Sequence, residues 1–221
     1  FEALQEACRA RGMMLIFDEA QTAFGRVGAA FAAEKMALVP DIMTVSKTLG
    51  GGIPLAATIT SDAIEEEAHA RGFTHYTSHV SDPLPAAVGL AVIETIEQER
   101  LIERARDLGV YLRAGLESLA QRYEAIGDIR GDGLLIGVEL VQDRESRKPD
   151  ADLGGRTTRR CMELGLSMNI KRRAERGAVW RLAPPLTITR QEIDRALAII
   201  DQALSETLDA AARERAANRP A

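Results

Sequence analysis

Two short apolar runs, each ending in a charged residue, constrain the fold of this chain most. Residues 13–17 lead into Asp18, and residues 42–46 lead into Lys47. Each run has the length and character of a strand that is buried on both faces of a parallel sheet. The stretch between the runs is long enough for one crossover connection. Because parallel strands present their carboxyl ends at one edge, where open α/β sheets bind ligands, we predict that Asp18 and Lys47 share such an edge.

The composition is that of an ordinary soluble globular protein. The chain has 221 residues, of which 46% are hydrophobic and 28% charged, with a net charge of −5. This charge gives no reason to expect a nucleic-acid partner. We see no transmembrane span or signal peptide, so we expect a cytoplasmic protein without a membrane partner. Cys8 and Cys161 lack metal-ligand spacing, which favours free thiols in a reducing compartment.

The pattern along the chain predicts one α/β domain followed by a smaller α+β domain. We place the boundary near Arg100, with a small domain over residues 101–208 and a frayed tail over 209–221. An N-cap at Asp62 and a capping box at Thr189 each mark the start of a helix. The other predicted elements are helices over 83–98, 101–123 and 154–164, and strands over 55–60, 134–141, 166–170 and 178–182.

A carboxylate and an amine at one sheet edge suit pyridoxal phosphate. The lysine would form the imine (Schiff base) with this cofactor, and the aspartate would keep the pyridine nitrogen protonated. The glycines at 50–52, just after Lys47, allow a close approach of the backbone. The alternative interpretation is a salt bridge, or two unrelated solvated charges, because motifs this short often match by chance.

Five longer motifs lie at residues 16–22, 25–28, 40–42, 46–50 and 181–185. Together they resemble the class III (subgroup II) aminotransferases, which are fold-type I pyridoxal-phosphate enzymes. The resemblance extends to about Leu204, and it implies an α/β chain that holds the second half of the large parallel-sheet domain and a small α+β domain. Segments 76–90 and 161–170 are similar to the 2,2-dialkylglycine decarboxylase branch of this family.

The resemblance implies a role for each matching residue. Lys47 corresponds to the imine-forming lysine and Asp18 to the partner of the ring nitrogen. Gln21 corresponds to a glutamine near the cofactor oxygen and the substrate carboxylate. Arg181 corresponds to the clamp of the substrate carboxylate, for which a guanidinium fork is well shaped. The alternatives are a solvated amide for Gln21 and a surface arginine for Arg181.

The polar loop over residues 73–82 carries further implied roles. Ser78, where the family usually has threonine, corresponds to a hydroxyl that reaches the cofactor phosphate of a partner subunit in a homo-oligomer. Ser78, Val80 and Asp82 correspond to part of a potassium or sodium site, which oxygen ligands suit. Tyr76 corresponds to an aromatic residue that lines the active site. A helix N-cap for Asp82 and a packing role for Tyr76 are the alternatives.

The implied activity is the decarboxylation of a 2,2-dialkylglycine, coupled to transamination of an α-keto acid such as pyruvate. The alternatives are a class III ω-aminotransferase without decarboxylation, and a truncated chain without catalytic activity. Residues 1–8 have the character of the middle of a helix, so we expect a fragment or a processed product. No glycine-rich phosphate loop precedes Asp18. We therefore expect the chain to carry the chemical residues without a complete cofactor site.

Overall fold

The computed structural model describes residues 1–173 and 177–217. The chain divides into two compact units, Phe1–Ala105 and Arg106–Ala221. Helix α5 (Leu101–Arg122) runs through this division. The domain boundary near Arg100 therefore remains a prediction, and the two units are described separately below.

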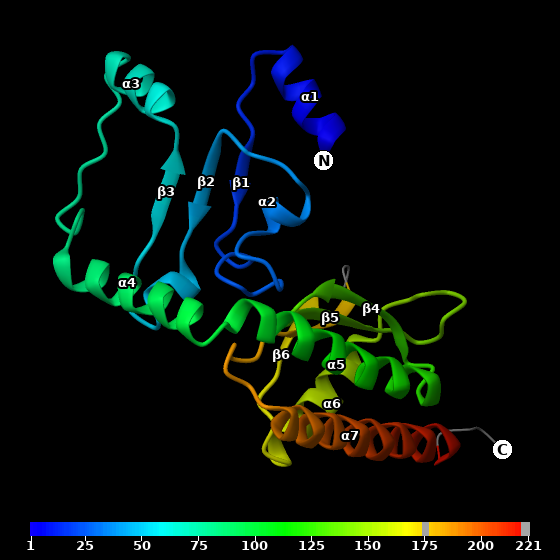
Figure 1. The fold of residues 1–221 in the computed structure, drawn as a ribbon. Helices are drawn as coiled ribbons and strands as arrows, with labels where there is room; N and C mark the ends of the chain where they lie inside the picture. The colour runs from blue at the N-terminus through cyan, green and yellow to red at the C-terminus, as the bar shows by residue number, and fades with distance from the viewer. Residues whose placement is uncertain (174–176, 218–221) are drawn as a thin grey trace. The chain divides into compact units, whose positions relative to one another are not determined.

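The first unit contains a three-stranded sheet in the order β1-β2-β3 (Figure 1). Strands β1 and β2 are parallel, as predicted, and Asp18 pairs in register with Thr44. Strand β3 is antiparallel to β2. The elements are α1 (Glu2–Ala10), β1 (Ile16–Asp18), α2 (Ala32–Lys35), β2 (Ile42–Val45), the 3-10 turn η1 (Lys47–Gly50), β3 (Ala57–Thr60), α3 (Asp62–Ala70) and α4 (Pro83–Gln98).

The strands of this sheet are less buried than their apolar sequences predict. Ile16 is 57% exposed and Phe17 is half-buried. Every residue of β3 is exposed. The prediction that the 13–17 run is buried on both faces is therefore wrong for the described residues, since Met13 and Met14 precede β1 in an exposed segment and Ile16 lies on an exposed face of the sheet. Strand β1 also begins only at Ile16.

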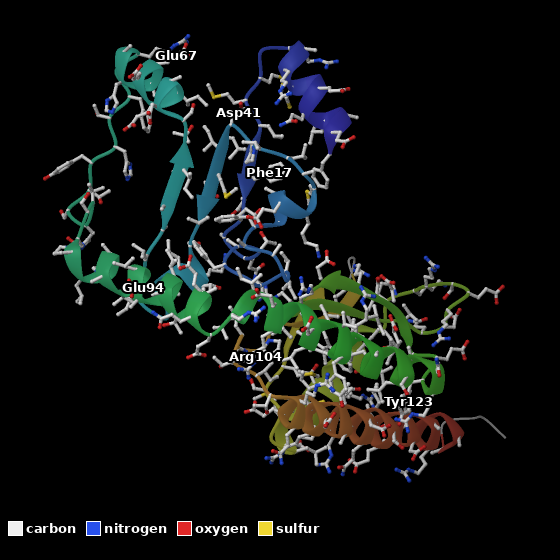
Figure 2. All side chains as sticks on the ribbon, viewed as in Figure 1. Phe17, Asp41, Glu67, Glu94, Arg104 and Tyr123 are labelled. Atoms are coloured by element: carbon white, nitrogen blue, oxygen red, sulfur yellow. The ribbon has the colours of Figure 1, made fainter. Side chains whose placement is uncertain are left out.

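Asp41 links the three strands at the end opposite to Asp18 and Lys47. Its carboxylate Oδ2 accepts a hydrogen bond of 2.7 Å from the Leu15 backbone N–H. Its own N–H donates to the Leu15 carbonyl at 2.9 Å. Its carbonyl accepts from the Thr60 hydroxyl at 2.9 Å. Figure 2 labels Asp41 at the start of β2. These bonds set the alignment of β1 and β2 from their amino ends.

Of the predicted starts of α3 and α4, one is confirmed and the other is wrong by one residue. Helix α4 begins at Pro83, as predicted, because proline is tolerated in the first turn. Helix α3 spans Asp62–Ala70, but Ser61 occupies the N-cap position. The prediction of Asp62 as the N-cap is therefore wrong by one residue.

The second unit is a four-stranded antiparallel sheet with helices packed against it. The strand order is β4-β5-β7-β6. Strand β4 was not predicted, because its glycines interrupt the apolar pattern and its strand geometry comes from pairing with β5. Strand β6 begins at Asn169 instead of Leu166. The elements after α5 are β4 (Ile126–Asp132), β5 (Leu135–Leu140), α6 (Ala151–Glu163), β6 (Asn169–Arg173), β7 (Gly177–Leu182) and α7 (Arg190–Ala217).

One face of this sheet forms the core of the second unit. Ile136, Val138 and Leu140 alternate along β5, and each is at most 1% exposed. Trp180 on β7 is fully buried, and its Nε1–H donates a 2.9 Å hydrogen bond to the Thr158 hydroxyl on α6. This confirms that Trp180 packs in the core. The hydrogen bond satisfies the one polar atom that burial of an indole would otherwise leave unpaired.

Helix α7 begins at the predicted capping box. The Glu192 carboxylate accepts from the Thr189 N–H at 2.8 Å, and the Thr189 hydroxyl accepts from the Glu192 N–H at 3.2 Å. The helix continues to Ala217, whereas we expected fraying from Asp209. Residues 218–221 of the predicted tail lie outside the described residues.

Both cysteines are buried free thiols. Burial raises the pKa of the Cys161 thiol to about 11. This thiol therefore stays protonated at neutral pH and is a poor nucleophile.

The end of α5 is joined to the middle of α7 through Asp201. Its Oδ1 accepts 2.5 Å contacts from the Arg122 guanidinium and from the Tyr123 hydroxyl, which Figure 2 labels. The hydrogen bond from Arg122, and then that from Tyr123, lowers the pKa of the Asp201 carboxyl below its ordinary 3.8. A lowered native pKa contributes stability that is present above the ordinary value and is lost as the pH falls through the native one.

We therefore predict that Asp201→Asn lowers the free energy of unfolding at pH 7 by about 1 kcal/mol or less, because the pair is partly exposed. The difference from wild type should shrink as the pH falls below 3.8 and through the lowered native pKa of Asp201. Urea unfolding across pH 2–7 measures it, and Asp209→Asn on the same helix is the control. A difference that stays constant with pH would contradict the role of the charge.

Candidate functional site

Asp18 and Lys47 lie at the carboxyl ends of two paired parallel strands. Asp18 is the last residue of β1, and Lys47 follows the last residue of β2 by two positions. The Asp18–Thr44 register places Lys47 three residues beyond the partner of Asp18. Both side chains are exposed. The structure therefore brings the two residues to neighbouring strand ends, as the sequence predicts.

Local hydrogen bonds orient the Asp18 carboxylate. Its Oδ1 accepts from the Ala20 N–H at 3.0 Å and from the Thr44 hydroxyl at 3.3 Å. No bond to Oδ2 occurs among the residues that the structure describes. One oxygen thus anchors the side chain and the other can accept a proton donor from a ligand. Thr44 was missed in the sequence analysis, although its register with Asp18 follows from parallel pairing.

Lys47 sits on a strained backbone. Its φ of 51° lies in the left-handed region, which a residue with a Cβ adopts at a cost of about 1–2 kcal/mol. The preceding Ser46 is extended, and the chain then turns into η1. Strain of this kind gathers at functional sites, where the surrounding structure holds it in place. Lys47 also lines a shallow depression with Ser46 and residues 52–56.

The turn that carries Lys47 is held by helix α4. A Cβ on Gly51 would lie 2.8 Å from a methyl group of Val92, and a Cβ on Gly89 would lie 2.6 Å from a methyl group of Leu55. Only glycine permits this close approach of the helix and the turn without a shift. The glycines therefore serve packing as well as the turn itself.

Asp18 and Lys47 suit two different groups of pyridoxal phosphate. The Asp18 carboxylate suits a protonated ring nitrogen, and the Lys47 amine suits the aldehyde carbon. The described residues hold no group of three or more His, Cys, Asp or Glu side chains placed to bind a metal ion.

Glu19 is a buried residue that the sequence analysis left without a role. It is 1% exposed. Its Oε1 accepts from the Ala33 N–H at the start of α2 at 2.8 Å, and its Oε2 accepts from the Thr22 hydroxyl. Its carbonyl accepts from the Ala23 N–H at 3.1 Å. Glu19 thus fixes the turn that carries Asp18 and the half-buried Gln21. Strand alternation was the available signal, since Asp18 faces outward and Glu19 inward.

Burial affects a second charged residue in this turn. Arg26 has its pKa lowered by desolvation. A partly desolvated guanidinium favours interaction with an anion.

Residues 73–81 of the polar loop are exposed, and Asp82 is half-buried. Tyr76 is 89% exposed, so it neither packs nor lines a site within this chain. The Asp82 carboxylate interacts with the ring of His79 at 2.9 Å. Asp82 occupies the N-cap position of α4 but makes no side-chain capping bond, and Ser78 is exposed. Asp82 therefore has the position of an N-cap residue but does not make the hydrogen bond of one.

Arg181 belongs to the second unit. It lies on β7, is half-buried, and pairs in register with Gly137. It also borders an open cavity of about 960 Å³, whose walls include Met162, Met168 and Pro185. An arginine at the rim of a mainly apolar cavity can bind a carboxylate while apolar groups pack beside it.

Comparison with known proteins identifies the family. The model of the aminotransferase class-III family matches residues 1–204. The chain belongs to the class III aminotransferases. An uncharacterized aminotransferase, C1039.07c, of Schizosaccharomyces pombe is 46% identical, over 93% of this chain and 46% of its own length. A leucine/methionine racemase of Thermococcus litoralis is 37% identical, over 93% and 45%.

A solved structure shares the fold of this class III aminotransferase chain. An amine transaminase from an uncultivated Pseudomonas species, in its PLP-bound form, has a TM-score of 0.84 and 30% identity, covering 92% of this chain and 47% of its own. The chain therefore has the α/β fold of part of a fold-type I PLP-dependent transferase. It spans about half the length of the curated relatives it matches.

No described helix of this chain combines the length and the apolar character needed to cross a membrane.

We predict that Glu19→Ala destabilises the turn beneath Asp18. The change leaves the buried Ala33 N–H without its acceptor, which costs about 1–3 kcal/mol. Glu19→Gln should cost less, because its amide oxygen can still accept from Ala33 and the Thr22 hydroxyl can rotate. Urea unfolding measures the difference, with the exposed Glu34→Ala as control. Equal stability of Glu19→Ala and Glu34→Ala would contradict this role.

Proposed function

We propose that the complete protein carrying this chain is a pyridoxal-phosphate enzyme that transfers an amino group between a small amine or amino acid and an α-keto acid. The observation that carries the proposal is the placement of Asp18 and Lys47 at neighbouring ends of paired parallel strands. Family membership supports the same chemistry. The cofactor, when bound, supplies an electron sink for the bond that breaks at the substrate carbon.

The chain's own residues would act as follows. Asp18 would hold a proton at the ring nitrogen through its free Oδ2, because Oδ1 is already engaged by the Ala20 N–H and Thr44. Lys47 would bind the cofactor covalently through its amine and carry a proton to and from the substrate carbon. Gln21, on the turn after Asp18, would donate a hydrogen bond to the cofactor oxygen or the substrate carboxylate.

Arg181 would bind the substrate carboxylate. Its guanidinium suits a bidentate contact, which fixes orientation as well as affinity. Positioning of this kind contributes to rate by holding the reacting bond in a productive geometry.

We further propose that the complete protein is a homo-oligomer. Ser78 would serve the cofactor phosphate of a neighbouring subunit, and Tyr76 would line that site. The exposure of the loop over residues 73–82 supports this proposal, because it leaves both side chains available to another chain.

A second candidate function is the decarboxylation of 2,2-dialkylglycines coupled to transamination of pyruvate. The similarity of segments 76–90 and 161–170 to that branch of the family favours it. In this case Ser78, Val80 and Asp82 would contribute oxygen ligands to a potassium or sodium ion. The Asp82 carboxylate would have to exchange its contact with His79 for the ion.

We predict that Lys47→Ala in the complete protein removes both the visible absorbance of the bound cofactor and the turnover. Asp18→Asn should retain partial cofactor binding and lose activity about 10- to 100-fold, because a charge-assisted hydrogen bond is worth about 1.5–3 kcal/mol. Absorbance spectra and amino-transfer assays measure these effects. Lys35→Ala on α2 is the matched control for lysine loss, and an unchanged visible band in Lys47→Ala would refute the assignment.

The decarboxylase candidate predicts release of carbon dioxide from 2-aminoisobutyrate when pyruvate is present. It also predicts that potassium stimulates the rate more than sodium, and that Asp82→Asn reduces this selectivity. A carbon dioxide assay with each chloride salt tests both points. Amino transfer without any carbon dioxide release would support the aminotransferase proposal and refute the decarboxylase proposal.

A further inference from the structure

Thr44 is joined to the end of β1 by its main chain and by its side chain. It pairs in register with Asp18, so the two side chains project from the same face of the sheet. The Thr44 carbonyl accepts a hydrogen bond of 2.9 Å from the Glu19 N–H. The Thr44 hydroxyl donates one of 3.3 Å to Oδ1 of Asp18. One residue of β2 therefore holds both the last peptide of β1 and the carboxylate that this strand carries.

Two donors reach Oδ1 of Asp18 from different elements. The Ala20 N–H, at 3.0 Å, belongs to the turn that follows Asp18, whereas the Thr44 hydroxyl comes from the neighbouring strand. A bond within the turn fixes the carboxylate relative to that turn only. The bond from Thr44 fixes it relative to the sheet, and both bonds leave Oδ2 for a ligand.

The residue type at position 44 suits this role. Asp18 is exposed, and an exposed carboxylate otherwise samples several rotamers whose loss on ligand binding costs free energy. Thr44 is half-buried, and its β-branched side chain has few χ1 rotamers, so its hydroxyl has a defined direction. An acceptor that is already oriented binds a donor more tightly, because less ordering is left to occur on binding.

We propose that Thr44 is a positioning residue that acts through Asp18: its hydroxyl holds Oδ1, so that Oδ2 is presented to the protonated ring nitrogen of pyridoxal phosphate. The inference rests on the proposed role of Asp18. It concerns the nitrogen end of the cofactor alone, so it predicts an effect that depends on the ring nitrogen and is absent without it.

The test measures dissociation constants of the complete protein, stripped of cofactor, for pyridoxal phosphate and for its 1-deaza analogue. The analogue has a C–H group in place of the ring nitrogen and cannot donate a hydrogen bond to Asp18. Thr44→Val should weaken binding of pyridoxal phosphate by about three- to tenfold, the range expected from one hydrogen bond, and leave binding of the analogue unchanged. Thr44→Ser, which keeps the hydroxyl, should restore most of the preference for pyridoxal phosphate. Because this preference is a ratio within one variant, a general loss of folded protein cancels.

Thr58→Val is the matched control. Thr58 pairs with Thr44 on the other side of β2 and is exposed on the same face. Two strand spacings, about 10 Å, separate Thr58 from Asp18, so its hydroxyl does not reach the carboxylate. Thr58→Val should leave both dissociation constants unchanged, and a loss equal to that of Thr44→Val would overturn the inference.

Asp18→Ala separates this inference from the proposed function. On the Asp18→Ala background, Thr44→Val should have no further effect, because its acceptor is gone. If the same loss persists on that background, Thr44 acts elsewhere and the inference is overturned. If Asp18→Ala removes the preference for pyridoxal phosphate but Thr44→Val keeps it, the inference is again overturned and the role of Asp18 stands. If Asp18→Ala itself keeps the preference, the assignment of Asp18 fails and the inference fails with it.

Discussion

The parallel pairing of β1 and β2 is the interaction on which the candidate site depends. It places the end of β1, with Asp18, beside Thr44, and it sends Lys47 into the turn just beyond. Asp41 sets the alignment from the other end of both strands through its bonds to Leu15. A change of register by one residue would turn Asp18 to the opposite face and exchange it with the buried Glu19.

Exposed and buried residues at this site have different roles. Asp18 and Lys47 are exposed and carry the proposed chemistry, whereas Glu19 and Gly89 are buried and hold the backbone. Buried hydrogen bonds in a turn stabilise it because their loss leaves a polar group unpaired. The strained backbone at Lys47 is thus supported by packing against α4.

In the second unit, the two faces of the antiparallel sheet differ in the same way. Its inner face buries Trp180 and the alternating residues of β5. The twofold periodicity of a strand places Trp180 in the core and its neighbour Arg181, the proposed carboxylate clamp, on the other face. Substitutions at Trp180 are therefore expected to act on folding, and those at Arg181 on ligand recognition.

The sequence by itself determined the elements whose signals are local. Helix α4 begins at its predicted proline, α7 begins at its capping box, and the two apolar runs predicted parallel strands ending at Asp18 and Lys47. The motifs also sufficed for the family, because they consist of contiguous residues. Tertiary structure alone decided that β3 is antiparallel, that β4 is a strand despite its glycines, and that Glu19 is buried beneath the turn. It also brought the Thr44 hydroxyl within hydrogen-bond distance of the Asp18 carboxylate. Such features arise from pairing between distant segments, for which no single stretch of sequence carries a signal.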